Sequence, residues 1–270
     1  MGDWLRVGAR MGHAVAMSGE LVGGVAGGSA QRKYEDLSRS WRRSMRKRFW
    51  VMGGVMAPIV AAVVAMGVIW ANLRWESGFL VGCLFAMFMI MRMSPPGWIE
   101  NWQDGAWGEQ WTGKELRPLE RKGWIVLHDL PLGRGNLDHV IVGPAGVFLL
   151  DSKRWRGRVT IENEVVTIRH TEDPDLSWCY GGAGRLRGAA RVVHKRVLEQ
   201  TRLSVWVEPV CVIWADFPQA TAGESCRFVG GKALAGWLSQ RPQKLPPDRV
   251  DQVADAVRQS WRGEETAQVS

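Results

Sequence analysis

The longest uncharged apolar stretch of the chain covers residues 49–73, a run of 25 residues. A helix needs about 20 apolar residues to cross a bilayer, so this stretch is long enough to span one. A second uncharged run, residues 77–91, is shorter, but the long side chain of Arg92 can reach the membrane surface and extend it. The link between the two runs is only three residues long. We therefore expect an antiparallel hairpin of two membrane helices, at about 49–73 and 75–93.

A basic segment precedes the first apolar run. Residues 31–48 contain eight Lys and Arg against two acidic residues. Positive charge resists translocation, so this segment should remain in the cytoplasm. The first helix then runs outward and the second returns the chain. This pattern predicts a multi-pass protein of the cell membrane whose C-terminal domain is cytoplasmic and whose hairpin contacts the lipid bilayer.

The second run decides on which side the C-terminal part lies, because without a second crossing that part would be extracellular. The chain has four cysteines and no CxxC spacing, which fits free thiols in a reducing cytoplasm better than a disulfide framework. The cysteines therefore favour the returning helix. We expect residues 1–48 to form a basic, poorly ordered cytoplasmic arm and residues 94–104 to form a linker.

From about residue 105 the hydrophobic pattern is typical of an α/β domain, which we expect to cover residues 105–262 and to be followed by a tail at 263–270. Helices are predicted at residues 108–120, 186–203, 232–238 and 247–260. Strands are predicted at residues 124–128, 140–142, 147–150, 158–161, 165–168 and 209–214.

A Gly-Pro-Ala-Gly turn at residues 143–146 separates two apolar runs and predicts a β-hairpin. If the first and last residues of the turn face each other, Asp138 on the first arm lies directly opposite Asp151 on the second. Directly opposed residues of a hairpin point to the same face. The two-residue period of a strand places Lys153 on that face as well.

Two carboxylates and a lysine gathered at the end of a strand can bind a divalent cation and activate water. Taken singly, acidic residues at strand ends are ordinary solvated residues, and only the combination favours a site. Mg²⁺ takes carboxylate oxygens and keeps several waters, so Asp138 and Asp151 would be direct ligands, joined by the carbonyl of Ser152. Lys153 would orient or activate the attacking water and offset negative charge in the transition state.

An ordered set of motifs surrounds this hairpin. Gly108-Glu109 opens a predicted helix, residues 137–144 read LDHVIVGP, and residues 151–157 read DSKRWRG. These motifs resemble the nuclease-related domain, a branch of the PD-(D/E)xK endonuclease-like superfamily. The resemblance is dense from about residue 108 to 161 and continues more weakly to about 261. Members of this family often have Glu or Gln where this chain has Asp151.

The resemblance implies an α/β fold with a restriction-endonuclease-like mixed sheet flanked by helices, here preceded by two transmembrane helices. It implies Mg²⁺ or Mn²⁺ as cofactor. It also implies that Glu109 completes the acidic cluster, as a metal ligand or through water, so that the catalytic set is Glu109, Asp138, Asp151 and Lys153 and the metal set is Asp138, Asp151 and Glu109.

The charge of the chain agrees with a polyanionic partner. The formal net charge is +8 and the isoelectric point is near 9.7, which favour nucleic acid or an anionic membrane surface. Arg154, Arg156 and Arg158 follow the hairpin and are suited to contact the phosphate backbone. Arg191 and Lys195 on the predicted helix at 186–203 are suited to do the same, although a solvated helix face explains them equally well.

These observations predict a membrane-anchored cytoplasmic nuclease-like protein that hydrolyses phosphodiester bonds of nucleic acid in a metal-dependent reaction, with DNA as the expected substrate. One alternative is a non-catalytic nucleic-acid-binding or scaffold module on the membrane, and another is a domain that binds a protein or lipid headgroups. His139 should point to the face opposite Asp138, whereas His128 has no evident partner. A composition rich in Ala, Gly, Arg and Trp and poor in Lys suggests a bacterium. The sequence leaves the oligomeric state open.

Overall fold

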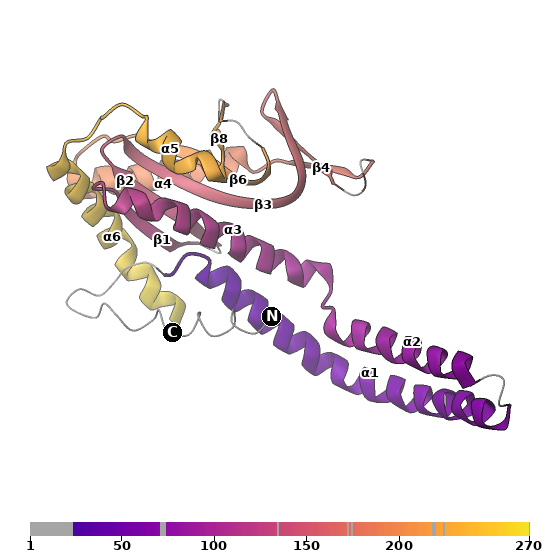
Figure 1. Ribbon diagram of the computed structural model, residues 1–270. Coiled ribbons are helices and arrows are strands. Elements are labelled where there is room, and N and C mark those ends of the chain that lie inside the picture. The colour runs from indigo at the N-terminus through magenta and orange to yellow at the C-terminus, as the bar shows by residue number, and fades with distance from the viewer. Residues whose placement is uncertain are drawn as a thin grey trace.

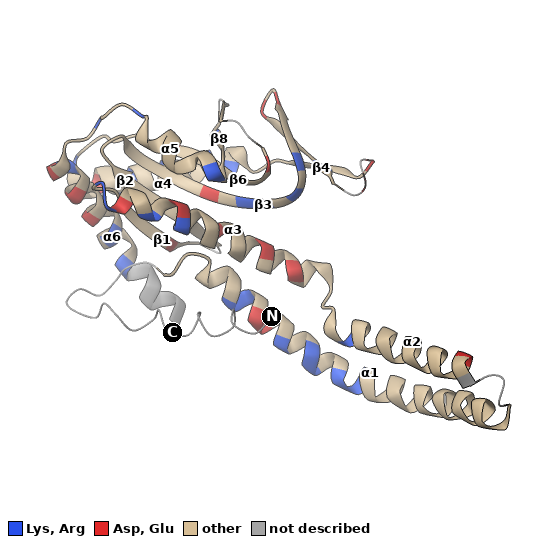
Figure 2. Ribbon diagram, viewed as in Figure 1, with Lys and Arg blue, Asp and Glu red and all other residues tan. Residues whose placement is uncertain are grey.

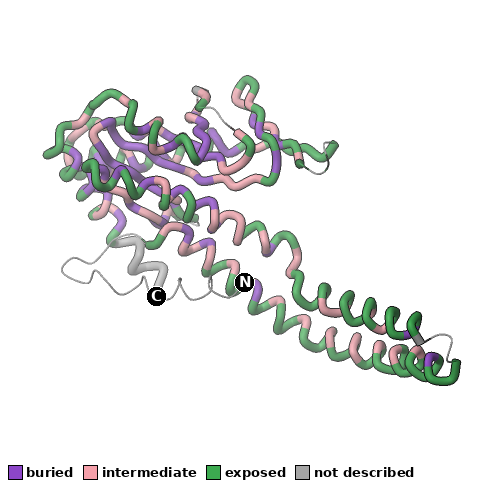
Figure 3. Tube along the Cα trace, in the orientation of Figure 1, coloured by how far each residue is buried: buried purple, intermediate pink, exposed green. Residues whose placement is uncertain are grey.

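The computed structural model describes residues 24–269 except 71–73, 134, 172, 174, 218–219 and 224. Two long helices, α1 (Gly28–Ile69) and α2 (Arg74–Met93), pack side by side as an antiparallel hairpin that projects from an α/β domain (Figure 1). Both helices are long and apolar enough to cross a membrane. Few residues in the outer part of the hairpin are buried (Figure 3), as expected for side chains that face lipid rather than a protein core.

The basic segment before the apolar run is helical, which differs from the poorly ordered arm that we expected. Helix α1 begins at Gly28 and continues without a break into the apolar run. Residues 29–52 contain neither Gly nor Pro, so nothing in this stretch interrupts helical hydrogen bonding. The part of the expected arm at residues 1–23 lies outside the described residues.

Two other expected irregular segments are also largely helical. Helix α3 (Gly97–Glu120) begins eleven residues before the predicted start at 108, so only residues 94–96 connect it to α2. Pro96 occupies the position before its first turn, where the missing N–H group of proline costs nothing. Helix α6 (Pro247–Val269) extends through most of the expected C-terminal tail.

The domain is built on one mixed sheet of eight strands, in the order β1-β2-β3-β6-β8-β7, with β4 paired to β3 and β5 paired to β4. The pairs β3–β6 and β6–β8 are parallel, and the other pairs are antiparallel. The strands are β1 (Ile125–Leu132), β2 (Gly135–Gly143), β3 (Gly146–Glu162), β4 (Val165–His170), β5 (Ser177–Tyr180), β6 (Val207–Asp216), β7 (Thr221–Ala222) and β8 (Arg227–Gly230).

Helices cover both faces of this sheet. Helices α4 (Ala183–Thr201) and α6 pack on one face, where Val147 and Leu149 of β3 enter the core. Helix α3 and the short helix α5 (Leu234–Ser239), which follows a 3-10 turn at Gly231–Ala233, pack on the other face against Phe148 and Leu150. The centre of β3 is buried on both faces of the sheet, so residues 147–150 are all apolar rather than alternating with polar residues. The predicted α/β fold with a mixed sheet flanked by helices is thus confirmed.

Strands β2 and β3 form the predicted β-hairpin, called the central hairpin below, and its register is the predicted one. Gly143 pairs with Gly146, and the ladder between β2 and β3 continues to His139 and Leu150. The second arm does not end at Lys153, because β3 continues to Glu162 past an irregularity after Arg154. The predicted strand at 158–161 is therefore the second half of β3. It forms a hairpin with β4 through Asn163 and Glu164, both of which have positive φ.

Candidate functional site

Helix α3 approaches β3 closely enough to place Glu109 beside the central hairpin. Gly108 allows this approach, since a Cβ atom there would lie 3.3 Å from the Cβ of Arg154. One turn later, Thr112 links the two elements: its hydroxyl accepts hydrogen bonds from the Ser152 hydroxyl and the Trp214 indole, both at 2.8 Å. The Gly108-Glu109 motif therefore has a structural reason, because the glycine brings the carboxyl group after it to the sheet.

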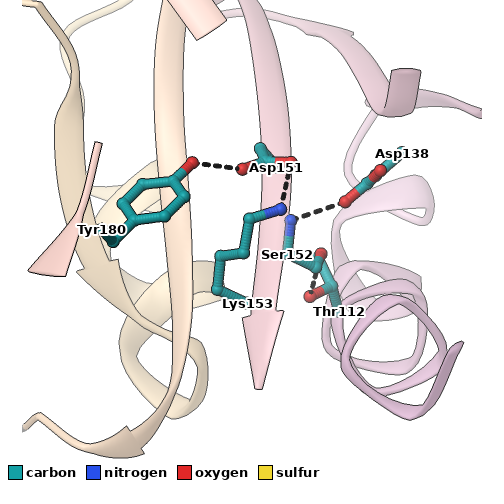
Figure 4. Close-up of polar contacts among 6 residues, drawn as sticks. All are labelled: Thr112, Asp138, Asp151, Ser152, Lys153 and Tyr180. Carbon is teal, nitrogen blue, oxygen red and sulfur yellow. Dashed lines mark hydrogen bonds and ion pairs between the residues drawn. The ribbon is translucent and has the colours of Figure 1, made fainter. Parts of the chain in front are cut away.

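Asp138 lies where the ladder between β2 and β3 ends. The last backbone pair of the ladder is His139 with Leu150. Asp138 and Asp151, the next residues on the two strands, are not paired, although we expected them to lie directly opposite each other. Instead the backbone amide of Ser152 donates a hydrogen bond of 2.7 Å to Oδ2 of Asp138 (Figure 4). This contact attaches the Asp138 carboxylate to the backbone beside Asp151.

Both oxygens of Asp151 have partners. Nζ of Lys153 lies 2.6 Å from Oδ1, and the hydroxyl of Tyr180 on β5 donates a hydrogen bond of 2.9 Å to Oδ2 (Figure 4). Lys153 thus reaches Asp151 two residues back along the same strand, on the same face of the sheet. Tyr180 is a site residue that the sequence reasoning missed.

Two cavities meet at these residues. One, of about 680 Å³, is lined by Glu109, Asp138, Ser152 and Lys153 and also by Ala30 of helix α1. The other, of about 210 Å³, is lined by Asp138, Asp151, Lys153, Tyr180 and Arg185. Asp138 and Lys153 border both cavities, whereas Glu109 borders only the larger one and Asp151 only the smaller one.

The surroundings of Glu109 and Asp138 disfavour the charged forms of these two carboxyl groups. Burial, and then the charge of Asp138, raise the pKa of Glu109 to about 9. Burial, and then the charge of Asp151, raise the pKa of Asp138 to about 7. Burial works in the opposite sense on Lys153, but the carboxylates of Asp151 and Asp138 outweigh it and raise the pKa of the lysine. Lys153 is therefore protonated at neutral pH.

The donor set fits a divalent cation through carboxylate oxygens, the ligands that Mg²⁺ and Mn²⁺ prefer. A cation would offset the repulsion that raises the pKa of Asp138. Within the described part of the chain, however, no three or more His, Cys, Asp or Glu residues stand close enough together to form a ready metal site. Asp138 and Asp151 are the two carboxylates that border the smaller cavity, whereas Glu109 borders the larger one.

Most of the basic residues expected to contact nucleic acid already have acidic partners. Arg154 forms an ion pair with Asp104 and lies over the rings of Trp107 and Trp111. Arg156 lies 3.3 Å from the same carboxylate.

The remaining basic residues, Arg158, Arg191 and Lys195, line neither of these two cavities. Arg158 lies 3.1 Å from Asp216. On helix α4, Lys195 lies 3.8 Å from Glu199, and Arg191 is exposed. The structure therefore places Arg154 and Arg156 at the larger cavity and Arg191 and Lys195 on a separate helix.

His128 is not without a partner, in contrast to the expectation from the sequence. It faces His139 across β1 and β2, with the two Nδ1 atoms 2.7 Å apart. Burial lowers the pKa of both imidazoles, so both rings are neutral at physiological pH and one donates to the other. As predicted, His139 does not share the face of Asp138; it is fully buried in the sheet.

Comparison with known families agrees with this geometry. Residues 104–214 match the model of the nuclease-related domain. The matched region begins in helix α3 and ends in β6, so it includes the strands and the helix that carry Glu109, Asp138, Asp151 and Lys153. The chain thus carries a nuclease-related domain, preceded by two helices that could span a membrane. No curated protein and no solved structure matched the chain.

Proposed function

We propose that this protein hydrolyses phosphodiester bonds of nucleic acid, with DNA as the polymer, in a reaction that depends on a divalent cation. The observation that carries the proposal is the grouping of Asp138, Asp151 and Lys153 around one cavity at the centre of a nuclease-related domain. Asp138 and Asp151 would hold Mg²⁺ or Mn²⁺. The bound ion would lower the pKa of a water molecule and offset charge on the phosphate.

The geometry supports a particular role for Lys153. A protonated lysine cannot accept a proton from water, and the raised pKa keeps Lys153 protonated. Its ammonium group would therefore donate hydrogen bonds to a phosphate oxygen on which negative charge develops in the transition state. Tyr180 would hold the carboxylate of Asp151 in place from the neighbouring β5 strand.

The two apolar helices support a membrane location for this activity. We propose that α1 and α2 cross the bilayer and that the domain lies in the cytoplasm. Lys and Arg of α1 gather on the half of the helix nearer the domain, and the outer half carries none (Figure 2). This distribution is the one expected when the basic end of a membrane helix remains on the cytoplasmic side.

The proposal is tested by measuring cleavage of linear and circular DNA by the full-length protein in neutral detergent, with Mg²⁺, Mn²⁺ or EDTA. Wild-type protein should cleave with a divalent cation and not with EDTA. Lys153→Ala and Asp151→Asn should reduce cleavage by about 10²-fold or more, since one transition-state contact is worth about that factor. Lys232→Ala, an exposed lysine beyond the matched region, serves as the control and should cleave like wild type.

One observation favours a second function. Both oxygens of Asp151 already bind protein groups, and the described residues contain no cluster of three metal-ligating side chains. A domain that binds nucleic acid without cleaving it would show the same features. Salt-sensitive DNA binding by wild-type protein, without cleavage under any divalent cation, would establish this second function and remove the first.

A further inference from the structure

A cavity of about 480 Å³ lies between the two long helices, at the end of the hairpin nearer the α/β domain. Helix α1 contributes three arginines and a phenylalanine to it, and helix α2 contributes its last two residues. The lining residues are Arg42, Arg43, Arg46, Phe49, Arg92 and Met93.

The cavity carries a concentrated positive charge. All four arginines are exposed, and none forms an ion pair with an acidic side chain among the residues that the structure describes. Asp36, the acidic residue of α1 nearest to them in sequence, pairs with Arg39 instead at 2.7 Å. Four guanidinium groups from two helices therefore converge without a counter-charge from the protein.

The floor of the cavity is apolar and joins the two helices. The ring of Phe49 packs edge-on against Phe88 of α2, with ring centroids 6.1 Å apart. The guanidinium of Arg92 lies over the Phe49 ring, 5.7 Å from its centroid. An exposed arginine that rests on an aromatic ring retains less freedom than a fully solvated one, so Arg92 is held toward the cavity.

The cavity lies at a defined level of the hairpin. Phe49 is the first residue of the 25-residue uncharged run of α1, and Met93 directly follows the charged residue that ends the run of α2. If the two runs lie in the hydrocarbon layer, the arginines lie at the level of the lipid headgroups, where basic pockets between membrane helices bind anionic lipids.

We propose that this cavity is a binding site for the phosphate of an anionic phospholipid headgroup, with an acyl chain passing over Phe49 toward the apolar run. Arginine suits this ligand because its planar guanidinium donates paired hydrogen bonds to phosphate oxygens. The apolar floor distinguishes a lipid from a free phosphate ion, which would gain nothing from Phe49 and Met93. This inference rests on the proposed membrane insertion of α1 and α2 and is independent of nuclease activity.

Two variants with the same loss of charge test the site. Arg46→Gln/Arg92→Gln removes two arginines of the cavity, and Lys47→Gln/Arg48→Gln removes two exposed basic residues at the same level that do not line it. Full-length protein in neutral detergent is titrated with phosphatidylglycerol, and bound lipid is counted by native mass spectrometry. The cavity variant should bind about tenfold or more weakly than wild type, and the control variant about as tightly as wild type.

Each other outcome contradicts a separate part of the inference. Equal weakening in both variants would show diffuse attraction of basic residues to anionic lipid and would overturn the site. Displacement of the lipid by millimolar inorganic phosphate would overturn the lipid as ligand. Flotation with phosphatidylcholine vesicles tests the anchor separately, because protein that does not float with neutral vesicles lacks the insertion on which the site depends.

Discussion

Among single residues, Glu109 and Asp138 stand out as acidic groups whose pKa is raised far above the ordinary value. Burial raises the pKa of both, to which the charge of Asp138 adds at Glu109 and the charge of Asp151 adds at Asp138. Most acidic residues in a folded protein are placed so that folding favours their charged form. At Glu109 and Asp138, folding instead favours the protonated form. Such raised pKa values are expected of carboxyl groups whose charged form is stabilised by a bound cation.

This arrangement predicts how stability depends on pH without metal. The pKa of Asp138 is raised from 3.8 to about 7 and that of Glu109 from 4.5 to about 9, so between these values the folded chain binds more protons than the unfolded chain. The free energy of unfolding from these two groups must then fall as pH rises from about 4 to 9. Thermal unfolding of full-length protein in EDTA should show a midpoint that decreases over this range.

The double variant Asp138→Asn/Glu109→Gln provides the control for this effect, because it cannot release the two protons. Its midpoint should change less between pH 5 and pH 9 than that of wild type. Mg²⁺ should raise the wild-type midpoint more at pH 8 than at pH 5, since metal ligation requires deprotonated carboxylates. Parallel pH curves for variant and wild type would show that the acidic pair does not control this dependence.

At the scale of elements, the central hairpin is held by close contact between its turn and the start of β1. Gly143 ends β2 beneath the ring of Trp124, and a Cβ atom at this position would lie 2.2 Å from two ring carbons. Trp124 is itself buried and packs against Phe148 of β3, with ring centroids 5.9 Å apart. The ring therefore has little room to move away.

Gly143→Ala should destabilise the protein by about 1–3 kcal/mol, because it overpacks a tight contact. Gly188→Ala is the matched control, since Gly188 is exposed in the middle of α4 and a Cβ there would meet nothing within 4 Å. Alanine at this helical position should stabilise by up to about 1 kcal/mol. Chemical denaturation measures both changes, and a neutral or stabilising Gly143→Ala would mean that Trp124 moves aside easily.

A second element-level contact joins the long helix α1 to the sheet. Asp129 of β1 is buried in a left-handed conformation with φ 54°, and its carboxylate accepts hydrogen bonds from the amide of Ser29 at 2.9 Å and from Asn136 at 2.7 Å. The amide of Gly24 also donates to the carbonyl of His128 at 3.0 Å. The first turn of α1 is thereby attached beside the larger cavity, to which it contributes Ala30.

Asp129→Asn should loosen this attachment while leaving the sheet intact. Asparagine tolerates the left-handed conformation but has only one acceptor oxygen for the two donors. A hydrogen bond to a charged group contributes roughly 1.5–3 kcal/mol, so amide exchange at residues 28–31 should accelerate by about tenfold or more. Asp251→Asn, an exposed aspartate of α6, is the control. Unchanged exchange in Asp129→Asn would show that the Asp129 carboxylate does not hold the helix and that other contacts, such as packing between α1 and α3, do so.

At the scale of the whole molecule, the hairpin and the domain form a continuous body. Helix α1 packs against both α2 and α3, so its basic half lies between the apolar runs and the domain (Figures 1 and 2). Because α1 packs on both α2 and α3, the domain remains close to the basic end of the hairpin. A membrane-bound protein of this shape would present its site within a short distance of the bilayer.

The proposed topology is tested with reporter fusions. Alkaline phosphatase, which is active only outside the cytoplasm, should be inactive when fused after Met93 and active when fused after residue 73, because the first helix leads outward and the second returns. Fusion after Met93 to a fluorescent protein that folds in the cytoplasm should give the complementary result. Phosphatase activity after Met93 would place the domain outside and contradict both the topology and the nucleic-acid substrate.

Features that depend on short stretches of chain could be predicted from the amino-acid sequence. The register of the central hairpin followed from the glycines of its turn, and the apolar run of β3 followed from burial on both faces. The apolar helices and the nuclease-related motifs were likewise readable along the chain. The predicted helices were too short at Gly28, Gly97 and Val269. Residues with good helix propensity extend a helix beyond the stretch that shows a hydrophobic pattern.

The contacts between residues of distant elements could not be predicted in this way, because they depend on how the elements pack together. Tyr180 reaches Asp151 because β5 folds back through β4 onto the edge of β3, and Arg154 meets Asp104 because α3 lies against that strand. His128 meets His139, and Asp129 meets Ser29, through pairings separated by 11 and 100 residues. Periodicity assigns a residue to a face of its own element, but the order of strands and the packing of helices determine what lies opposite that face.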